Sequence, residues 1–177
     1  MIWAILNKDH DIALNELYKE HQSDRVVAII GGAMLDDSLR LALKYRFRLP
    51  VGNETDIADK LLKVGRPLGN TEPKIDLAYS LYIMEKDQRN AMYGITEIRN
   101  LFAHRLGMNF QDEDKKLNDA LGKLSLHVGK TYYPSLGGQE PIEPIDGPKD
   151  QFIVNLKFCL ITLMRDHGQH RPGSNVR

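Results

Sequence analysis

The feature that most constrains the fold is a helical apolar pattern that begins near Asp87 and ends at Leu106. Its apolar residues recur every three or four positions and so line one side of an α-helix: Met92, Ile95, Ile98, Leu101, Phe102 and Leu106. Gly107 follows, and glycine suits the left-handed turn that often ends a helix. A helix of about 20 residues is roughly 30 Å long. A helix of that length with one apolar side needs other helices to cover that side.

The same spacing recurs along most of the chain. A second long helix begins after Ser23 or Asp24, either of which can cap it, and ends before Pro50. Gly31 and Gly32 lie inside it, where each costs about 1 kcal/mol relative to alanine, so we expect another helix to approach closely there. Shorter periodic segments predict helices at 12–21, 54–65, 74–84, 112–127 and 150–166. Since no stretch alternates as a strand would, the sequence predicts an all-α, single-domain bundle of about seven helices.

The composition changes after residue 130. Residues 131–148, TYYPSLGGQEPIEPIDGP, contain four prolines and three glycines, which predicts a long loop without regular structure. We therefore divide the chain into a helical body at 1–130, the Pro/Gly-rich loop at 131–148, and a C-terminal helix at 149–168 that packs on the body. The polar residues 169–177 are expected to form a mobile tail.

The charge balance excludes some functions. The 24 basic residues match 24 acidic ones, so the chain lacks the broad positive charge of a protein that binds DNA by itself. The single cysteine, Cys159, excludes an internal disulfide and a thiolate metal cluster. No apolar run reaches the ~20 residues of a membrane span, and the N-terminus lacks the positive region of a signal peptide. We expect a cytoplasmic protein without a metal or cofactor.

One local basic run stands out against this balance. Arg40, Lys44, Arg46 and Arg48 follow one another with no acidic residue between them. Cations near the end of a helix are favourable by themselves, because they complement its dipole. The same four residues are a candidate contact patch for a nucleic acid or a protein partner.

Three polar residues interrupt the apolar pattern described first. Arg99, Asn100 and His104 lie within EIRNLFAHRLG, and Asn100 and His104 share one helix face. Asp76, inside the apolar KIDLAY, is a candidate partner for Arg99. One interpretation is a polar network satisfied inside the bundle, since buried polar groups are generally paired. The other is a binding or reactive surface, in which His104 moves a proton while Arg99 steadies a scissile RNA phosphate.

Three segments together resemble the mannitol operon repressor (MtlR-like) proteins of bacteria. They are DRVVAIIGGAMLDDSLRLAL at 24–43, RPLGNTEPKIDLAYSLYIM at 66–84 and IRNLFAH at 98–104. The resemblance implies an all-helical cytoplasmic protein that helps to repress a sugar-alcohol operon. Because the family has no recognisable DNA-binding motif, it also implies repression through another protein. A homo-oligomer is expected.

The third segment also resembles the R-x4-H signature of HEPN domains. In HEPN ribonucleases this motif lies at a dimer interface and cuts RNA without a metal, and Arg99, Asn100 and His104 are the matching positions here. KIDLAY departs from a generic HEPN domain and favours the MtlR-like interpretation. Our leading hypothesis is therefore a non-enzymatic regulator that acts by protein contact. A HEPN-like ribonuclease and a toxin-type RNA-binding module are the alternatives.

Overall fold

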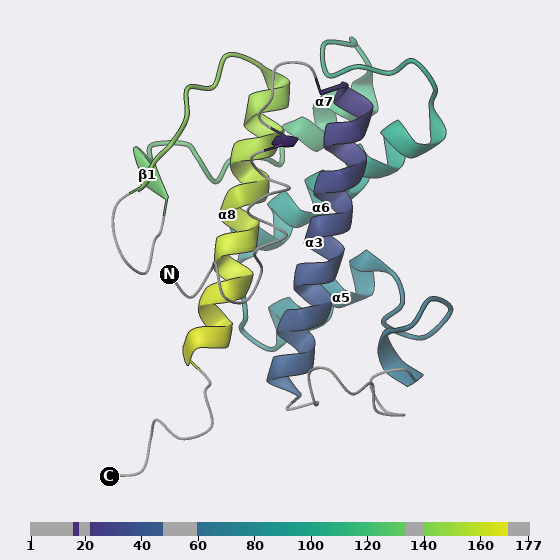
Figure 1. Cartoon of the computed structure of the whole chain (residues 1–177), viewed down its shortest axis with the longest axis vertical. Helices are drawn as coiled ribbons and strands as arrows, with labels where there is room; N and C mark the ends of the chain where they lie inside the picture. The colour runs from purple at the N-terminus through teal and green to yellow at the C-terminus, as the bar shows by residue number, and fades with distance from the viewer. Residues whose placement is uncertain (1–15, 18–21, 48–59, 134–139, 170–177) are drawn as a thin grey trace.

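A computed structural model describes residues 16–17, 22–47, 60–133 and 140–169 of the chain (Figure 1). Five helices, α3, α5, α6, α7 and α8, and two short strands, β1 and β2, are defined in these ranges. They are α3 (Asp24–Arg46), α5 (Thr71–Ser80), α6 (Lys86–His104), α7 (Lys115–Leu121), β1 (Tyr132–Tyr133), β2 (Glu140–Pro141) and α8 (Pro148–Gln169). With 64% helix and 3% strand, the predicted all-α bundle is confirmed.

The predicted helices at 12–21 and 54–65 lie largely outside the described residues. Inside these ranges, residues 16–17 and 60–62 are helical. Arg48 and the predicted tail also fall outside the description, apart from residue 169, the last residue of α8. In the part of the chain that is described, no helix combines the length and the apolar character needed to cross a bilayer.

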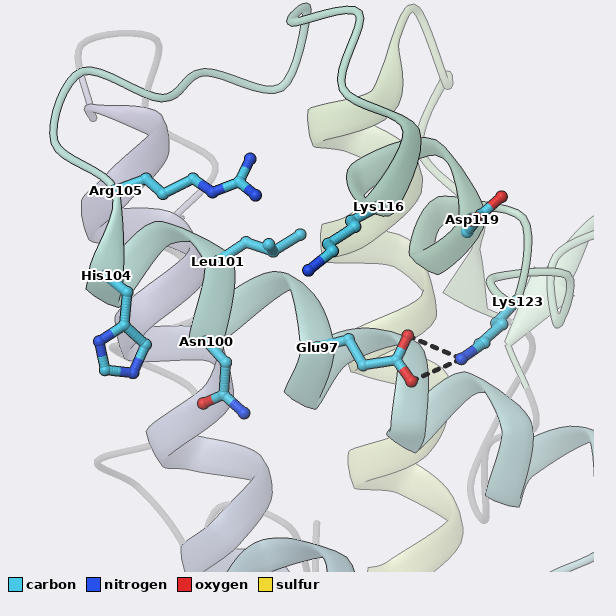
Figure 2. Close-up of a pocket in the computed structure, with 8 residues that line it drawn as sticks. All are labelled: Glu97, Asn100, Leu101, His104, Arg105, Lys116, Asp119 and Lys123. Carbon is cyan, nitrogen blue, oxygen red and sulfur yellow. Dashed lines mark hydrogen bonds and ion pairs between the residues drawn. The ribbon is translucent and has the colours of Figure 1, made fainter.

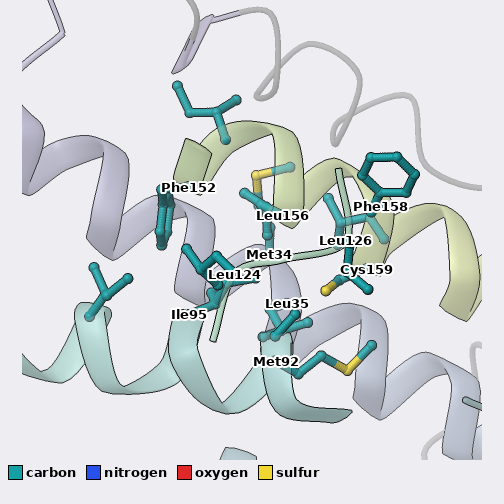
Figure 3. Close-up of a cluster of buried hydrophobic side chains, with 14 of the residues drawn as sticks. Met34, Leu35, Met92, Ile95, Leu124, Leu126, Phe152, Leu156, Phe158 and Cys159 are labelled. Atoms are coloured by element: carbon teal, nitrogen blue, oxygen red, sulfur yellow. The ribbon is translucent and has the colours of Figure 1, made fainter. Parts of the chain in front are cut away.

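The core forms where α3, α6 and α8 meet. Figure 1 shows α3 and α8 running side by side, with α6 packed across them. Leu35 of α3, Ile95 of α6 and Phe152 of α8 are all fully buried, and Figure 3 shows how these three helices supply one continuous apolar cluster. Cys159 belongs to this cluster, and burial raises the pKa of its thiol. The cysteine is therefore a packing residue and not a nucleophile.

The two adjacent glycines of α3 explain why the three helices can pack so closely. A Cβ atom on Gly31 would lie 2.8 Å from Cε1 of Phe152 in α8. A Cβ atom on Gly32 would lie 2.4 Å from Cγ and 2.7 Å from Cβ of Arg99 in α6. All three distances are shorter than any ordinary carbon–carbon contact. The predicted close approach is confirmed, and it involves two helices, one beside each glycine.

The ends of the helices follow from local capping. Ser23 caps α3, and its hydroxyl accepts a hydrogen bond from the Val26 amide at 3.3 Å. Glu85 and Gln88 form a reciprocal capping box at the start of α6. The helix ends at His104, two residues before the predicted Leu106, because Arg105 has an extended backbone. Gly107 then takes the left-handed conformation expected of it, with φ of 80°.

Helix α7 is shorter than predicted. The sequence pattern spans 112–127, whereas the helix covers Lys115–Leu121 and is followed by turns. Asp114 begins it by accepting a hydrogen bond from the Leu117 amide at 3.0 Å. Gln151 of α8 donates to the carbonyls of Leu121 and Leu124 and so satisfies the chain where the helix stops. A tertiary contact therefore sets this end.

The Pro/Gly-rich segment contains a short β-ribbon, so the prediction of no regular structure was wrong at four residues. β1 and β2 pair antiparallel, with Tyr132 opposite Pro141 and Tyr133 opposite Glu140. Lys157 of α8 fastens the ribbon, because its ammonium lies 2.5 Å from Glu140 and 4.3 Å from the centre of the Tyr133 ring. The strands persist because α8 anchors them; an isolated pair this short would be unstable.

Candidate functional site

The C-terminal half of α6 brings Arg99, Asn100 and His104 to the surface. Arg99 and His104 are exposed, and Asn100 is half-buried. On the opposite side of the same helix, Ile98 and Phe102 are fully buried in the core. The polar trio therefore lies on the outer edge of α6, and the predicted network sealed inside the bundle is not what the structure shows.

The position of Arg99 is determined by both α6 and α3. Its aliphatic stem fills the space left by the missing side chain of Gly32. Its guanidinium emerges beyond that contact and donates a hydrogen bond to Oδ1 of Asn100 at 2.9 Å. Among the described residues, this amide is the one hydrogen-bond or ion-pair partner of the guanidinium. The guanidinium thus has an amide partner, and no carboxylate of the described residues neutralises its charge.

The structure does not join Asp76 to this trio. The Asp76 carboxylate instead accepts two hydrogen bonds from Arg89, at 2.6 and 3.1 Å. The Arg89 guanidinium also stacks 5.0 Å from the centre of the Tyr79 ring and 5.4 Å from that of Tyr93. These hydrogen bonds hold the pKa of Asp76 below its usual value. Asp76 lies on the exposed side of α5, where the start of α6 supplies a nearer arginine than Arg99.

A pocket of about 530 Å³ opens between α6 and α7, next to the trio (Figure 2). Asn100 and His104 line one side of it. The other lining residues are Glu97, Leu101, Arg105, Lys116, Asp119 and Lys123. In Figure 2, Arg105 and Lys116 extend toward Leu101 from opposite sides.

Ion pairs fix two of the cations around this pocket. Lys123 of the segment after α7 lies 2.5 and 2.6 Å from the two carboxylate oxygens of Glu97. Arg105 lies 2.5 Å from Asp114, the residue that caps α7. The hydrogen bond from Arg105 lowers the pKa of Asp114, and the bond from the Leu117 amide adds to this. The end of α6 is thereby tied to the start of α7.

Sequence reasoning identified only part of this pocket. Asn100 and His104 were predicted to share one helix face, but Glu97 and Leu101, which also line the pocket, were not predicted to join them. The α7 side was not predicted either, because Lys116 and Lys123 join it only through the packing of α7 on α6. Nothing in their local sequence indicates that contact.

The basic run does not form a single exposed patch. Lys44 is buried with 6% of its surface exposed, and Arg46 donates a hydrogen bond to the Leu81 carbonyl at 2.8 Å. Arg40 lies 3.6 Å from Asp37 on the same helix. Arg48 falls outside the described residues. The three described cations are thus largely committed to contacts within the chain.

Comparison with protein-family models, curated proteins and solved structures gives no match to this chain. The site must therefore be interpreted from its own geometry. The described residues contain no group of three histidine, cysteine or carboxylate side chains placed to hold a metal ion. What the site offers is an exposed arginine, an amide and an imidazole beside a pocket with several cations.

Proposed function

We propose that this chain is an MtlR-like helical regulator that acts by contact with another protein. The observation that carries the proposal is the open position of Arg99, Asn100 and His104 at the seam between α3 and α6. Arg99 emerges beside Gly32 of α3, and Ala103, one turn further along α6, accepts a hydrogen bond from Arg25 of α3. An exposed arginine supported by packing is typical of the residues that carry binding energy at protein interfaces.

Contacts between the two helices make the seam a continuous surface. The stem of Arg99 lies over Gly32, and the Arg25 guanidinium donates to the Ala103 carbonyl at 3.3 Å. The N-terminal half of α3 and the C-terminal half of α6 are thus held together at two points. A partner can therefore bind both helices without the entropic cost of ordering one against the other.

The charge distribution supports an indirect action on DNA. The chain has no net charge, and the described cations of the basic run are engaged by Asp37, by a carbonyl or by burial. We expect the purified protein to leave a DNA fragment from its own operon unshifted in a gel at physiological salt. A shift without any other protein would overturn the proposal of indirect action, since non-specific binding weakens steeply with salt.

A HEPN-like ribonuclease is the second candidate, and one observation favours it. Arg99 and His104 are both exposed, and neither is bonded to a carboxylate within the described residues. In that function, His104 would transfer a proton and Arg99 would stabilise the charge on the phosphate.

The ribonuclease is tested by incubating RNA with the purified protein in EDTA. Cleavage by the wild type that is lost in His104→Ala and strongly reduced in Arg99→Lys would establish it, because lysine lacks the bidentate fork of arginine. Sedimentation velocity of the same samples would show whether the protein forms the expected oligomer. No cleavage by the wild type would remove this candidate.

A further inference from the structure

The pocket between α6 and α7 has more positive than negative side chains. Arg105, Lys116 and Lys123 line it, against the two carboxylates of Glu97 and Asp119. Arg105 also pairs with Asp114, which does not line the pocket. The pocket volume of about 530 Å³ lies in the range of sites for small molecules.

Lys116 differs from the other two cations in having no carboxylate partner among the described residues. Lys123 is paired with Glu97, and Arg105 with Asp114. Within the described residues, no carboxylate lies within ion-pair distance of Lys116. Figure 2 shows its ammonium reaching over the pocket toward Leu101.

The remaining lining groups complement a ligand with a charged end and a less polar body. Leu101 provides an apolar contact between the two cations that extend over it, Arg105 and Lys116. Asn100 adds an amide that can donate or accept a hydrogen bond. A phosphate group has several acceptor oxygens, which suit a guanidinium fork and an ammonium together.

We propose that this pocket binds a small molecule that carries a phosphate group. The phosphate lies between Lys116 and Arg105, and the body of the molecule contacts Leu101 and Asn100. Because Asn100 and His104 line the pocket and also belong to the seam, a bound molecule alters the surface that a partner meets. The binding itself does not depend on the proposed regulator function.

Two adjacent lysines give a matched test. Lys115 and Lys116 are both exposed in the first turn of α7, but only Lys116 lines the pocket. Lys115→Gln and Lys116→Gln remove the same charge at the same helix end, so their effects on folding and on net charge are alike. Circular dichroism verifies that both variants fold.

The probes are inorganic phosphate, glycerol 3-phosphate and an eight-nucleotide uridine RNA, each titrated by NMR at constant ionic strength. We expect saturable shifts from glycerol 3-phosphate that centre on the pocket. Lys116→Gln should weaken this binding by about threefold to tenfold, as the loss of a partly exposed charge-assisted contact does. Lys115→Gln should change it by less than about 1.5-fold, because salt screens the more distant charge.

Three results would overturn the proposal. The first is equal weakening in both lysine variants, which would mean that only the general charge attracts the probe. The second is the absence of saturable shifts at the pocket. The third is RNA binding tighter than that of glycerol 3-phosphate and lost in both Lys116→Gln and Arg99→Ala, which would identify a nucleic acid as the source of the phosphate. Failure of the partner-contact proposal would change none of these readings.

Discussion

Substituting Gly32 tests how Arg99 is held at the surface. In Gly32→Ala, the new methyl group would lie 2.4 Å from Cγ and 2.7 Å from Cβ of Arg99. Carbon atoms prefer about 3.5–4.0 Å, so α3 and α6 must separate or the arginine must rotate. The overlap involves the base of the side chain, which cannot move without the backbone. Overpacking of this kind costs about 1–3 kcal/mol.

The helix propensity of alanine offsets part of this cost, and a second glycine measures the offset. Gly122 has helical backbone angles, and a Cβ there would lie 3.4 Å from the Asn118 carbonyl, an ordinary contact. Gly122→Ala should therefore stabilise the protein by about 0.4–1 kcal/mol. Gly32→Ala should be less stable than Gly122→Ala by about 1–3 kcal/mol. Thermal unfolding followed by circular dichroism should show this as about 2–4 °C of Tm for each kcal/mol.

The close approach of α3 and α6 at Gly32 requires that the two glycine variants differ in stability. Equal stability would mean that α3 and α6 do not approach as closely as the contact with Arg99 requires. Gly32→Ala should also displace the guanidinium from Asn100, which the side-chain amide resonances of Asn100 report in NMR spectra. Unchanged resonances would contradict the role given to Gly32.

Three further substitutions test other contacts. Asn155→Leu leaves the buried amide of Leu126 without its acceptor and should cost about 2–3 kcal/mol in urea unfolding; an unchanged midpoint would contradict this. In Asp76→Asn, the bonds with Arg89 that lower the carboxyl pKa are weakened. The native carboxylate stabilises the fold above its usual pKa of 3.8. The difference in unfolding free energy between wild type and Asp76→Asn should therefore be largest at neutral pH and should shrink as the pH falls below 3.8. A difference that grows in acid would refute the role of this carboxylate. Lys157→Met should speed hydrogen exchange in residues 131–148, because β2 loses its ion pair to α8; unchanged exchange would show that the ribbon is held otherwise.

The helical bundle could be predicted because its signals are local. The apolar period of α6 and the Ser23 cap of α3 each depend on residues within a few positions. Gly31 and Gly32 also indicated close packing, since interior glycines are costly unless another element approaches. These features survive in the structure because the tertiary contacts agree with them.

The partners of the polar residues could not be predicted, because they depend on how the helices pack. Asp76 pairs with Arg89 and not with Arg99, because the short turn after α5 brings the start of α6 back beside Asp76. Arg99 is exposed because Gly32 accommodates its aliphatic stem and leaves its guanidinium in solvent. Lys116 and Lys123 reach the pocket only after α7 docks. The sequence shows which residue types are available for such a site, but tertiary packing determines which of them lie close together.

The central claim is that the seam around Arg99 is where a partner protein binds, and site-specific photo-crosslinking tests it most directly. A photoreactive residue placed at Ala103, one turn after Arg99 on α6 and in contact with Arg25 of α3, is irradiated in the native cells, in wild type, Arg99→Glu and Lys86→Glu backgrounds. Lys86 is exposed at the other end of α6, about 20 Å along the helix. We predict one specific protein adduct that disappears in Arg99→Glu and persists in Lys86→Glu. An adduct equally strong in both variants, or none in any background, would contradict the claim.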